Sequence, residues 1–186
     1  FKKIYPNKSI KTSTQFKNEI KKSIESQYDQ QSDQKFLDDV TKKLIEEVKF
    51  DLPRKFLIKW LQKRDEKEIS LENATEQFEK SEKGLRYQLI EEEIINHNNL
   101  KVKEKEIKEF AKKIFLGQFG QISKKDNNQE IEQMVERILR NEEERKRIIE
   151  QVKTGKLLKF FKENVKFKSK KLSYDSFIKM AYTTTQ

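Results

Sequence analysis

The density of charge is the feature that most restricts how this chain can fold. Of its 186 residues, 40% are Asp, Glu, Lys or Arg, and such side chains have to stay in water. A compact sphere has too little surface for so many charges, whereas an elongated helical body has enough. Leu, Ile, Val and Phe still make up about 27% of the chain, more than is typical of a disordered protein. Gly (4) and Pro (2) are rare, which disfavours a turn-rich β fold. We therefore predict an all-α protein with an elongated helical body.

Apolar residues recur at helical spacing through the first third of the chain. Thr12 and Gln15 have the form of a capping box, which satisfies free backbone N–H groups at a helix start. A stripe from Phe16 to Tyr28 then repeats every four residues, as on one face of a helix. After the polar residues 29–33 we predict a second helix with its own apolar face. Pro53 suits the first turn of a third helix, where its missing N–H costs nothing.

Capping and stop residues predict the remaining helices. Ser70 is placed to cap a long helix that ends near Asn98 and Asn99. A further helix ends between Gly117 and Gly120, and the polar residues 123–128 are turn-like. Helical spacing resumes from about 131 to 165. A last short helix is predicted to begin at Ser173.

Most classes of catalytic site are disfavoured by the composition. The chain has no cysteine and one histidine, His97, so thiolate sites and most zinc sites have too few ligands. The acidic runs 91–93 and 142–144 point in different directions from their helices. We find no phosphate loop or nucleophile motif, and predict no catalytic residue, metal site or cofactor. No apolar run approaches the roughly 20 residues that span a bilayer. The chain starts with Phe rather than Met, so we expect a fragment of a longer protein.

The stretch from Lys153 to Lys171 carries eight lysines and one acid, Glu163. One interpretation is attraction to nucleic acid, because phenylalanines lie among the lysines and aromatic rings can stack on bases. The other is a solvated helix face, because the first four lysines recur every three residues. Phe160 and Phe161 also fit the helical apolar pattern. The sequence leaves the role of this stretch open.

A cluster of apolar residues surrounds the predicted helix end near Gly117. Apolar groups at the end of a helical hairpin can remain exposed, and exposed apolar patches usually mark binding sites. They can equally close a small local core. The flexible thioether of Met134 suits contacts with varied partners. Our candidates for binding a polypeptide are Ile114, Phe115, Phe119, Met134 and Ile138.

Several segments resemble the arm-bearing C-terminal domain of bacterial trigger factors. Phe50-Asp51-Leu52-Pro53-Arg54-Lys55-Phe56-Leu57 resembles the opening of its helical region, and 84–90 with 98–110 resembles the stretch that follows. The opening residues 1–5 resemble the exit from the isomerase domain, and 172–177 the C-terminal helix. Lys103 departs from the pattern, because the family often has a Thr there as helix cap.

The resemblance implies an all-α body with two protruding helical-hairpin arms. We expect residues 1–52 to form the entry helices of the body, 53–122 the first arm and body, and 123–186 the second arm and C-terminal helix. Full-length members also carry an N-terminal ribosome-docking domain and an FK506-binding-type prolyl isomerase domain. Neither is visible in this sequence, so isomerase activity would lie in the intact protein and this chain would not be an enzyme.

The resemblance also implies a function and its partners. We expect an ATP-independent chaperone module that holds unfolded or nascent polypeptides in the cytoplasm. The ribosome would bind through the N-terminal domain, and a homodimer is compatible with the sequence. We expect no membrane partner, and nucleic acid is disfavoured. Two alternatives remain: a basic helical nucleic-acid-binding protein, and a chaperone domain like those of periplasmic parvulin-type chaperones, whose helical folds are related.

Overall fold

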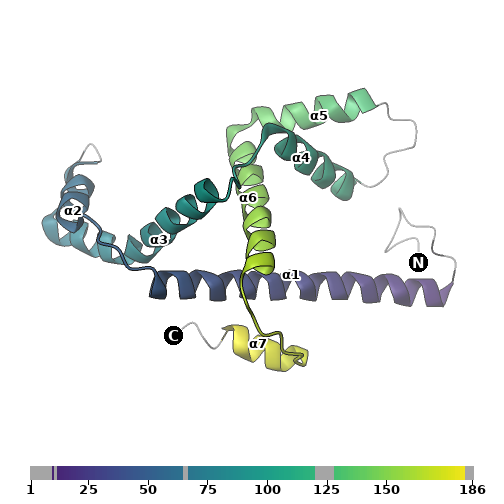
Figure 1. The fold of residues 1–186 in the computed structure, drawn as a ribbon. Coiled ribbons are helices and arrows are strands. Elements are labelled where there is room, and N and C mark those ends of the chain that lie inside the picture. Colours follow the sequence, from purple (N-terminus) through teal and green to yellow (C-terminus); the bar gives the residue numbers. More distant parts are fainter. Residues whose placement is uncertain (1–9, 11, 65–66, 120–127, 183–186) are drawn as a thin grey trace. The chain divides into compact units, whose positions relative to one another are not determined.

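Helices are the only regular secondary structure in the described part of the chain. The computed structural model describes residues 10, 12–64, 67–119 and 128–182 (Figure 1). The all-α prediction is confirmed, because these residues form seven α-helices and no strand. The helices are α1 Ser13–Glu47, α2 Arg54–Lys63, α3 Leu71–His97, α4 Glu104–Phe119, α5 Asn128–Arg140, α6 Glu142–Asn164 and α7 Tyr174–Tyr182.

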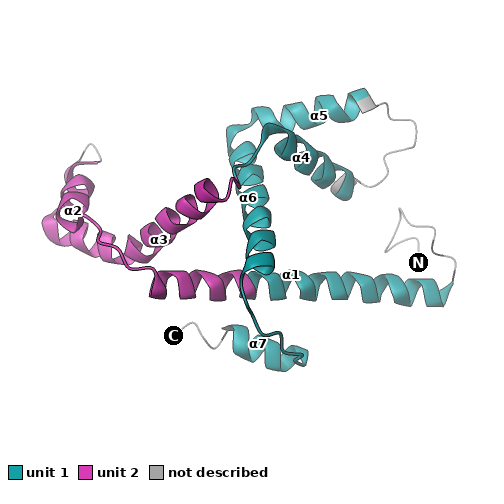
Figure 2. Cartoon of the chain, in the orientation of Figure 1, with its two compact units in different colours: residues 1–35, 101–186 teal, residues 36–100 magenta. Residues whose placement is uncertain are grey.

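The chain divides into two compact units (Figure 2). One unit combines Phe1–Lys35 with Lys101–Gln186, and the other is Phe36–Leu100. The first therefore contains α4 to α7, and the second contains α2 and α3. The predicted segment boundaries after residues 52 and 122 concern the division into body and arms, and they stay a prediction.

Helix α1 is one continuous helix of 35 residues, and the predicted break at residues 29–33 is wrong. This stretch is polar but contains neither Gly nor Pro, so each residue can still donate its backbone N–H to the carbonyl four residues earlier. The predicted capping box is present. The Thr12 N–H donates to Gln15 Oε1 and the Gln15 N–H donates to Thr12 Oγ1, both at 3.2 Å.

Helix α3 begins and ends where the sequence predicted. The Ser70 hydroxyl accepts a hydrogen bond from the Asn73 N–H at 3.2 Å. At the other end Asn99 adopts a left-handed conformation with φ 54°. The N–H of Leu100 then donates to the carbonyl of Ile95, the crossing bond of a Schellman ending. Asparagine tolerates this conformation better than most residues, so the Asn98-Asn99 pair ends the helix.

Polar contacts of two arginines hold α2 and the preceding segment to α3. The Arg54 guanidinium lies 5.1 Å above the Phe78 ring and 2.6 Å from Glu79 Oε1. The guanidinium of Arg86 lies 5.3 Å from the Phe50 ring centroid and donates to the Phe50 carbonyl at 2.7 Å. Pro53 is the N-cap of α2, one residue before the predicted first turn.

Candidate functional site: the α4–α5 pair

Helices α4, α5 and α6 share the one cluster of buried residues found in the described part of the chain. Each helix contributes two aliphatic side chains that are at most 8% exposed. The spacing of four residues between members on each helix places them on a single face. This core fills the side of the α4–α5 pair that packs against α6. Its members are Ile107, Ala111, Val135, Leu139, Ile148 and Val152.

The boundary between α5 and α6 depends on a single asparagine. The Asn141 side-chain oxygen accepts hydrogen bonds from the Glu143 and Glu144 N–H groups at 3.0 and 3.1 Å. Residues 140–147 contain no apolar side chain, so apolar periodicity alone did not locate the break. Asn141 before three glutamates is nevertheless a strong N-cap pattern. The cap redirects the chain so that α6 packs against both α4 and α5.

Two ion pairs fasten the start of α4 to α6. Arg145 donates through both terminal nitrogens to Glu104, at 3.1 and 2.8 Å. Lys156 lies 2.8 Å from Glu106 and also donates to the carbonyl of Lys101 at 3.0 Å. The hydrogen bond from Arg145 lowers the pKa of Glu104, and that from Lys156 lowers the pKa of Glu106.

Glu106 also caps the start of α4. Its carboxylate accepts a hydrogen bond from the Lys103 N–H at 2.8 Å. This is the returning half of a capping box, in which the third helical residue bonds the backbone N–H of the cap residue. A lysine at 103 therefore still permits α4 to begin at Glu104.

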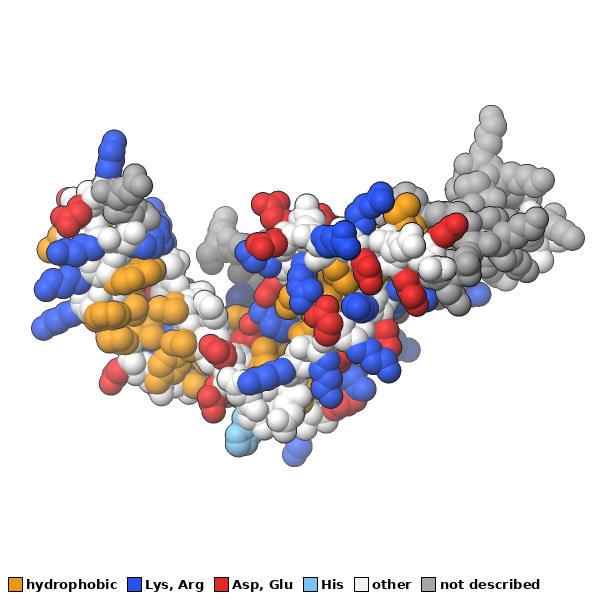
Figure 3. Space-filling model, turned by 90° about the horizontal axis from the view of Figure 1, so that it is seen from above, with side chains coloured by type: hydrophobic (Ala, Val, Ile, Leu, Met, Phe, Trp, Pro, Cys, Tyr) orange, Lys and Arg blue, Asp and Glu red, His pale blue; other side chains and the backbone are white. Residues whose placement is uncertain are grey.

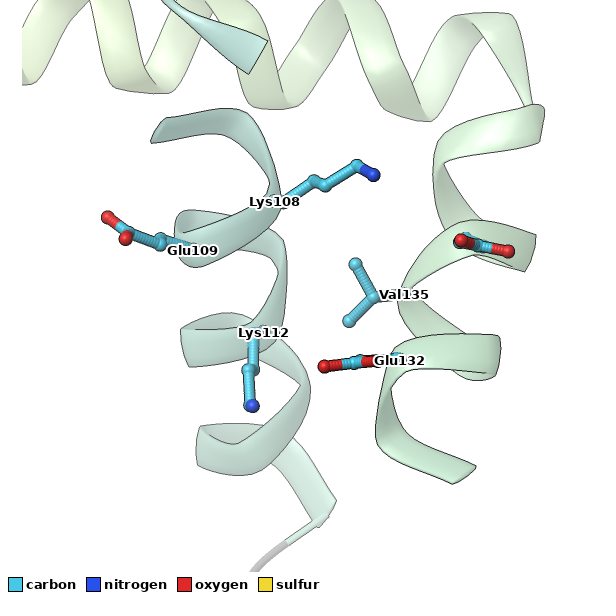
Figure 4. Close-up of a pocket in the computed structure, with 6 residues that line it drawn as sticks. Lys108, Glu109, Lys112, Glu132 and Val135 are labelled. Atoms are coloured by element: carbon cyan, nitrogen blue, oxygen red, sulfur yellow. The ribbon is translucent and has the colours of Figure 1, made fainter. Parts of the chain in front are cut away.

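A groove of about 370 Å³ runs between α4 and α5 (Figure 4). Lys108 and Lys112 belong to its α4 side, and Glu132 projects from α5 toward α4 beside Val135. The groove therefore has one apolar lining residue, Val135, among charged side chains of both signs. Such a surface can cover an apolar side chain of a bound polypeptide. The charged side chains and the polar backbone groups at its edge can stay hydrated. The full lining is Lys108, Glu109, Lys112, Glu132, Val135 and Glu136.

The structure places the five candidate residues in different environments. Ile114 and Ile138 are half-buried against the three-helix core. Phe115 is only 8% exposed, so a bound polypeptide could contact it only after neighbouring side chains moved. Met134 is 44% exposed. Phe119 is the last residue of α4, but its side chain lies outside the described residues.

Leu116 is an exposed apolar residue that was not among the candidates. It is 42% exposed and follows Lys108 and Lys112 at four-residue intervals, so it continues the α4 side of the groove by one turn. Met134 precedes Val135 of the groove lining and therefore lies about 100° around α5 from it. The spacing from the two lysines could have identified Leu116. The same spacing does not show that Phe115 is buried.

The lysine-rich stretch divides into two parts. In α6, each of the four lysines of this stretch forms an ion pair: Lys153 with Glu150, Lys156 with Glu106, Lys159 with Glu163, and Lys162 with Asp33. Phe161 is 3% exposed and contacts Phe160, so this ring cannot stack on a base. Beyond α6, the lysines at 166, 168, 170 and 171 are exposed. A solvated, ion-paired face therefore accounts for the helical half.

Two further observations concern the described residues. None of their helices is both long and apolar enough to cross a bilayer. They also contain no group of three or more His, Cys, Asp or Glu side chains arranged to hold a metal ion.

The described residues form an all-α chain in which several apolar side chains are exposed. A family model described as "Probable trigger factor, C-terminal domain" matches residues 32–181. The chain therefore belongs to the family of trigger-factor C-terminal domains, and the suspected resemblance is confirmed. The match contains no catalytic domain. Comparison with curated proteins and with solved structures gave no significant match.

Proposed function

We propose that this chain is an ATP-independent chaperone module that holds unfolded or nascent polypeptides on the α4–α5 arm. Family membership supports a chaperone-type role. The observation that carries the proposal is the exposure of Leu116 and Met134, at 42% and 44%, on helices whose inner faces are already packed. Exposed apolar groups on a well-packed arm are available to cover the apolar side chains of another chain.

The contact would be weak and reversible. At about 25 cal/mol per Å² of buried apolar area, a few hundred Å² contributes several kcal/mol before the entropic cost of ordering the bound chain. The groove beside Val135 could accept a single apolar side chain. The predicted contacts are Leu116 together with the original candidates Ile114, Phe115, Phe119, Met134 and Ile138, of which Phe115 would require local movement.

The chain would act without an active site of its own, in the cytoplasm. Ribosome attachment and prolyl isomerisation would belong to other domains of the intact protein, as the family resemblance implies. The chain would be able to pair with a second copy of itself as a homodimer. A periplasmic-type chaperone domain is the less favoured alternative, because the family match is to trigger factors.

Replacing Leu116 and Met134 together with Ser tests this proposal. Aggregation of an unfolded model protein is measured by light scattering with increasing amounts of chaperone. We expect the double variant to require several-fold more protein for equal suppression, with unchanged helicity. Ile24→Ser is the control, because Ile24 is 42% exposed on α1, outside the arm. Equal suppression by the double variant and the control would refute the arm as the binding surface.

The nucleic-acid alternative predicts a different measurement. Affinity for a single-stranded oligonucleotide should fall steeply with salt if the exposed lysines neutralise phosphates. Since the helical half of the stretch is ion-paired, we expect no binding at low salt. Salt-sensitive binding that is lost when Lys166 and Lys168 are replaced by Glu would favour this alternative over the chaperone.

A further inference from the structure

Helix α2 has an apolar face that nothing covers in the described residues. Phe56 is 65% exposed and Trp60 is 50% exposed, and their spacing of four residues places them on one side of the helix. No residue of α2 is buried. Seen from above, hydrophobic side chains gather over α2 and α3, with cationic side chains beside them (Figure 3). Two adjacent exposed aromatic rings are a large apolar area for such a short helix.

Positive charge borders this aromatic pair. The sequence from Arg54 to Arg64 contains five cations and no acid. Lys55 and Lys59 are exposed, and no acidic side chain of the described residues forms an ion pair with either. Arg64 lies 5.7 Å from the Trp60 ring centroid. Asp65 and Glu66 follow in the sequence but lie outside the described residues. The face is therefore aromatic at its centre and cationic at its edges.

We propose that the α2 face is a second polypeptide-binding surface, selective for acidic segments that also carry apolar side chains. This proposal rests on the proposed chaperone function. It adds a preference for acidic segments, which the α4–α5 groove does not select because its own charges are mixed. Apolar side chains of the segment cover Phe56 and Trp60. Its carboxylates lie near the lysines, where opposite charge speeds encounter and discriminates against basic segments.

Dimensions limit the segment to a short one. Helix α2 has 10 residues, which at 1.5 Å per residue is about 15 Å. Lys55 and Lys59 are separated by about 6 Å along the axis, which is one helical turn. Acidic residues one helical turn apart, or two residues apart in an extended segment, have nearly this spacing. The partner is thus a local acidic and apolar motif rather than a folded domain.

Trp60 provides a direct measurement, because it is the single tryptophan of the chain. The full chain is titrated with a tryptophan-free peptide of Leu, Phe, Asp and Glu, and the emission of Trp60 is recorded. We expect a saturable blue shift that weakens as salt is added. A peptide with Lys in place of the acidic residues should bind at least tenfold more weakly.

Two variants and two matched controls locate the contact. Lys55→Glu with Lys59→Glu should weaken the acidic peptide roughly tenfold, and Phe56→Ser should weaken it several-fold while keeping the Trp60 signal. Lys42→Glu with Lys83→Glu makes the same charge change on exposed lysines of α1 and α3. Phe167→Ser removes another exposed aromatic ring. Neither control should change the affinity.

The outcomes separate this proposal from the chaperone function itself. No Trp60 response in a protein that still suppresses aggregation would overturn only the α2 surface. No response and no suppression would overturn both. Equal affinity in the Lys55→Glu, Lys59→Glu variant would refute selection by charge. A stronger Trp60 response to an oligonucleotide, or to phosphatidylglycerol vesicles, than to the peptide would overturn a polypeptide as the partner.

Discussion

The three-helix cluster and the α2–α3 pair use their apolar residues in opposite ways. Helix α5 has five apolar side chains among 13 residues, and two of them, Val135 and Leu139, are buried in the core. Helix α2 has five among only 10 residues and buries none of them. The helix with the larger apolar share is thus the less buried. The apolar content of a helix shows how many side chains can be buried. The number of helices that pack on it decides how many of them are buried.

The type of contact differs in the same way. In the cluster, aliphatic side chains of three helices pack together, and ion pairs lie at the edge. In the pair, Ala74 and Phe78 of α3 are buried, and the guanidinium of Arg54 adds an exposed contact with Phe78 and Glu79. Buried aliphatic contacts are worth several kcal/mol per residue, whereas exposed ion pairs contribute roughly 0–1 kcal/mol. The two regions should therefore respond very differently to substitution.

The largest effect is expected from Ile148→Ala in the cluster. Ile148 is 3% exposed, and its truncation leaves a cavity that should cost about 3 kcal/mol. Leu57→Ala in α2 removes a half-buried side chain and should cost about 1 kcal/mol. Urea unfolding followed by circular dichroism measures both. Equal costs would show that α2 is as firmly packed as the cluster, and Ile148→Val should lie near 1 kcal/mol.

A smaller effect is expected at Glu106, which both caps α4 and pairs with Lys156. Glu106→Ala removes both contacts and should cost about 1.5 kcal/mol. Glu106→Gln keeps an oxygen that can accept from the Lys103 N–H, so it should cost about half as much. The same urea titration distinguishes them. Identical losses in the two variants would mean that the capping bond contributes nothing.

Acid should weaken the cluster through the same groups. The pKa values of Glu104 and Glu106 are lowered from the ordinary value of 4.5 by hydrogen bonds from Arg145 and Lys156. A carboxyl with a lowered folded pKa stabilises the protein above its unfolded pKa, and this contribution is lost as the pH falls through the folded pKa. Stability measured from pH 6 downward should therefore decline below about 4.5. A Glu104→Gln, Glu106→Gln variant should show a shallower decline.

The sequence was a good guide to helix ends that depend on local contacts. Ser70, Thr12 with Gln15, and the Asn98-Asn99 pair each satisfy free backbone groups within a few residues of themselves. Such contacts need no distant partner, so they can be recognised from sequence alone. The predicted break in α1 failed for the converse reason. Polar residues without a capping or breaking function do not end a helix.

Burial was harder to predict than helicity. Phe115 and Met134 were both proposed as exposed binding residues, yet one is 8% and the other 44% exposed. Both lie in amphipathic helices, and which faces of these helices become buried depends on the positions of α4, α5 and α6. Those positions depend on the Asn141 cap and on ion pairs across 41 and 50 residues of sequence. No local pattern encodes pairs so far apart.

The effect expected at Arg54 in the α2–α3 pair is smaller than the effect at Glu106. Arg54→Ala removes the ring contact and the exposed ion pair, which together should cost about 1 kcal/mol. Arg54→Lys keeps the charge but not the flat guanidinium, so it should recover less than half of this. Unfolding followed by Trp60 emission reports on this unit directly. Lys80→Ala, which breaks only the exposed pair with Glu76, should change nothing measurable.

The smallest effect is expected from filling two helix-interior glycines, and here the two regions should agree. A Cβ added at Gly84 in α3 or at Gly155 in α6 meets no atom within 4 Å. Alanine restricts the unfolded chain more than glycine does, so each substitution should add about 0.5–1 kcal/mol to the free energy of unfolding. The gain depends on helix propensity and not on the surrounding core, so Gly84→Ala and Gly155→Ala should raise the urea midpoint similarly. A gain in α6 with a loss in α3 would show that α3 needs a glycine at this position, and that the two regions differ in backbone as well as in packing.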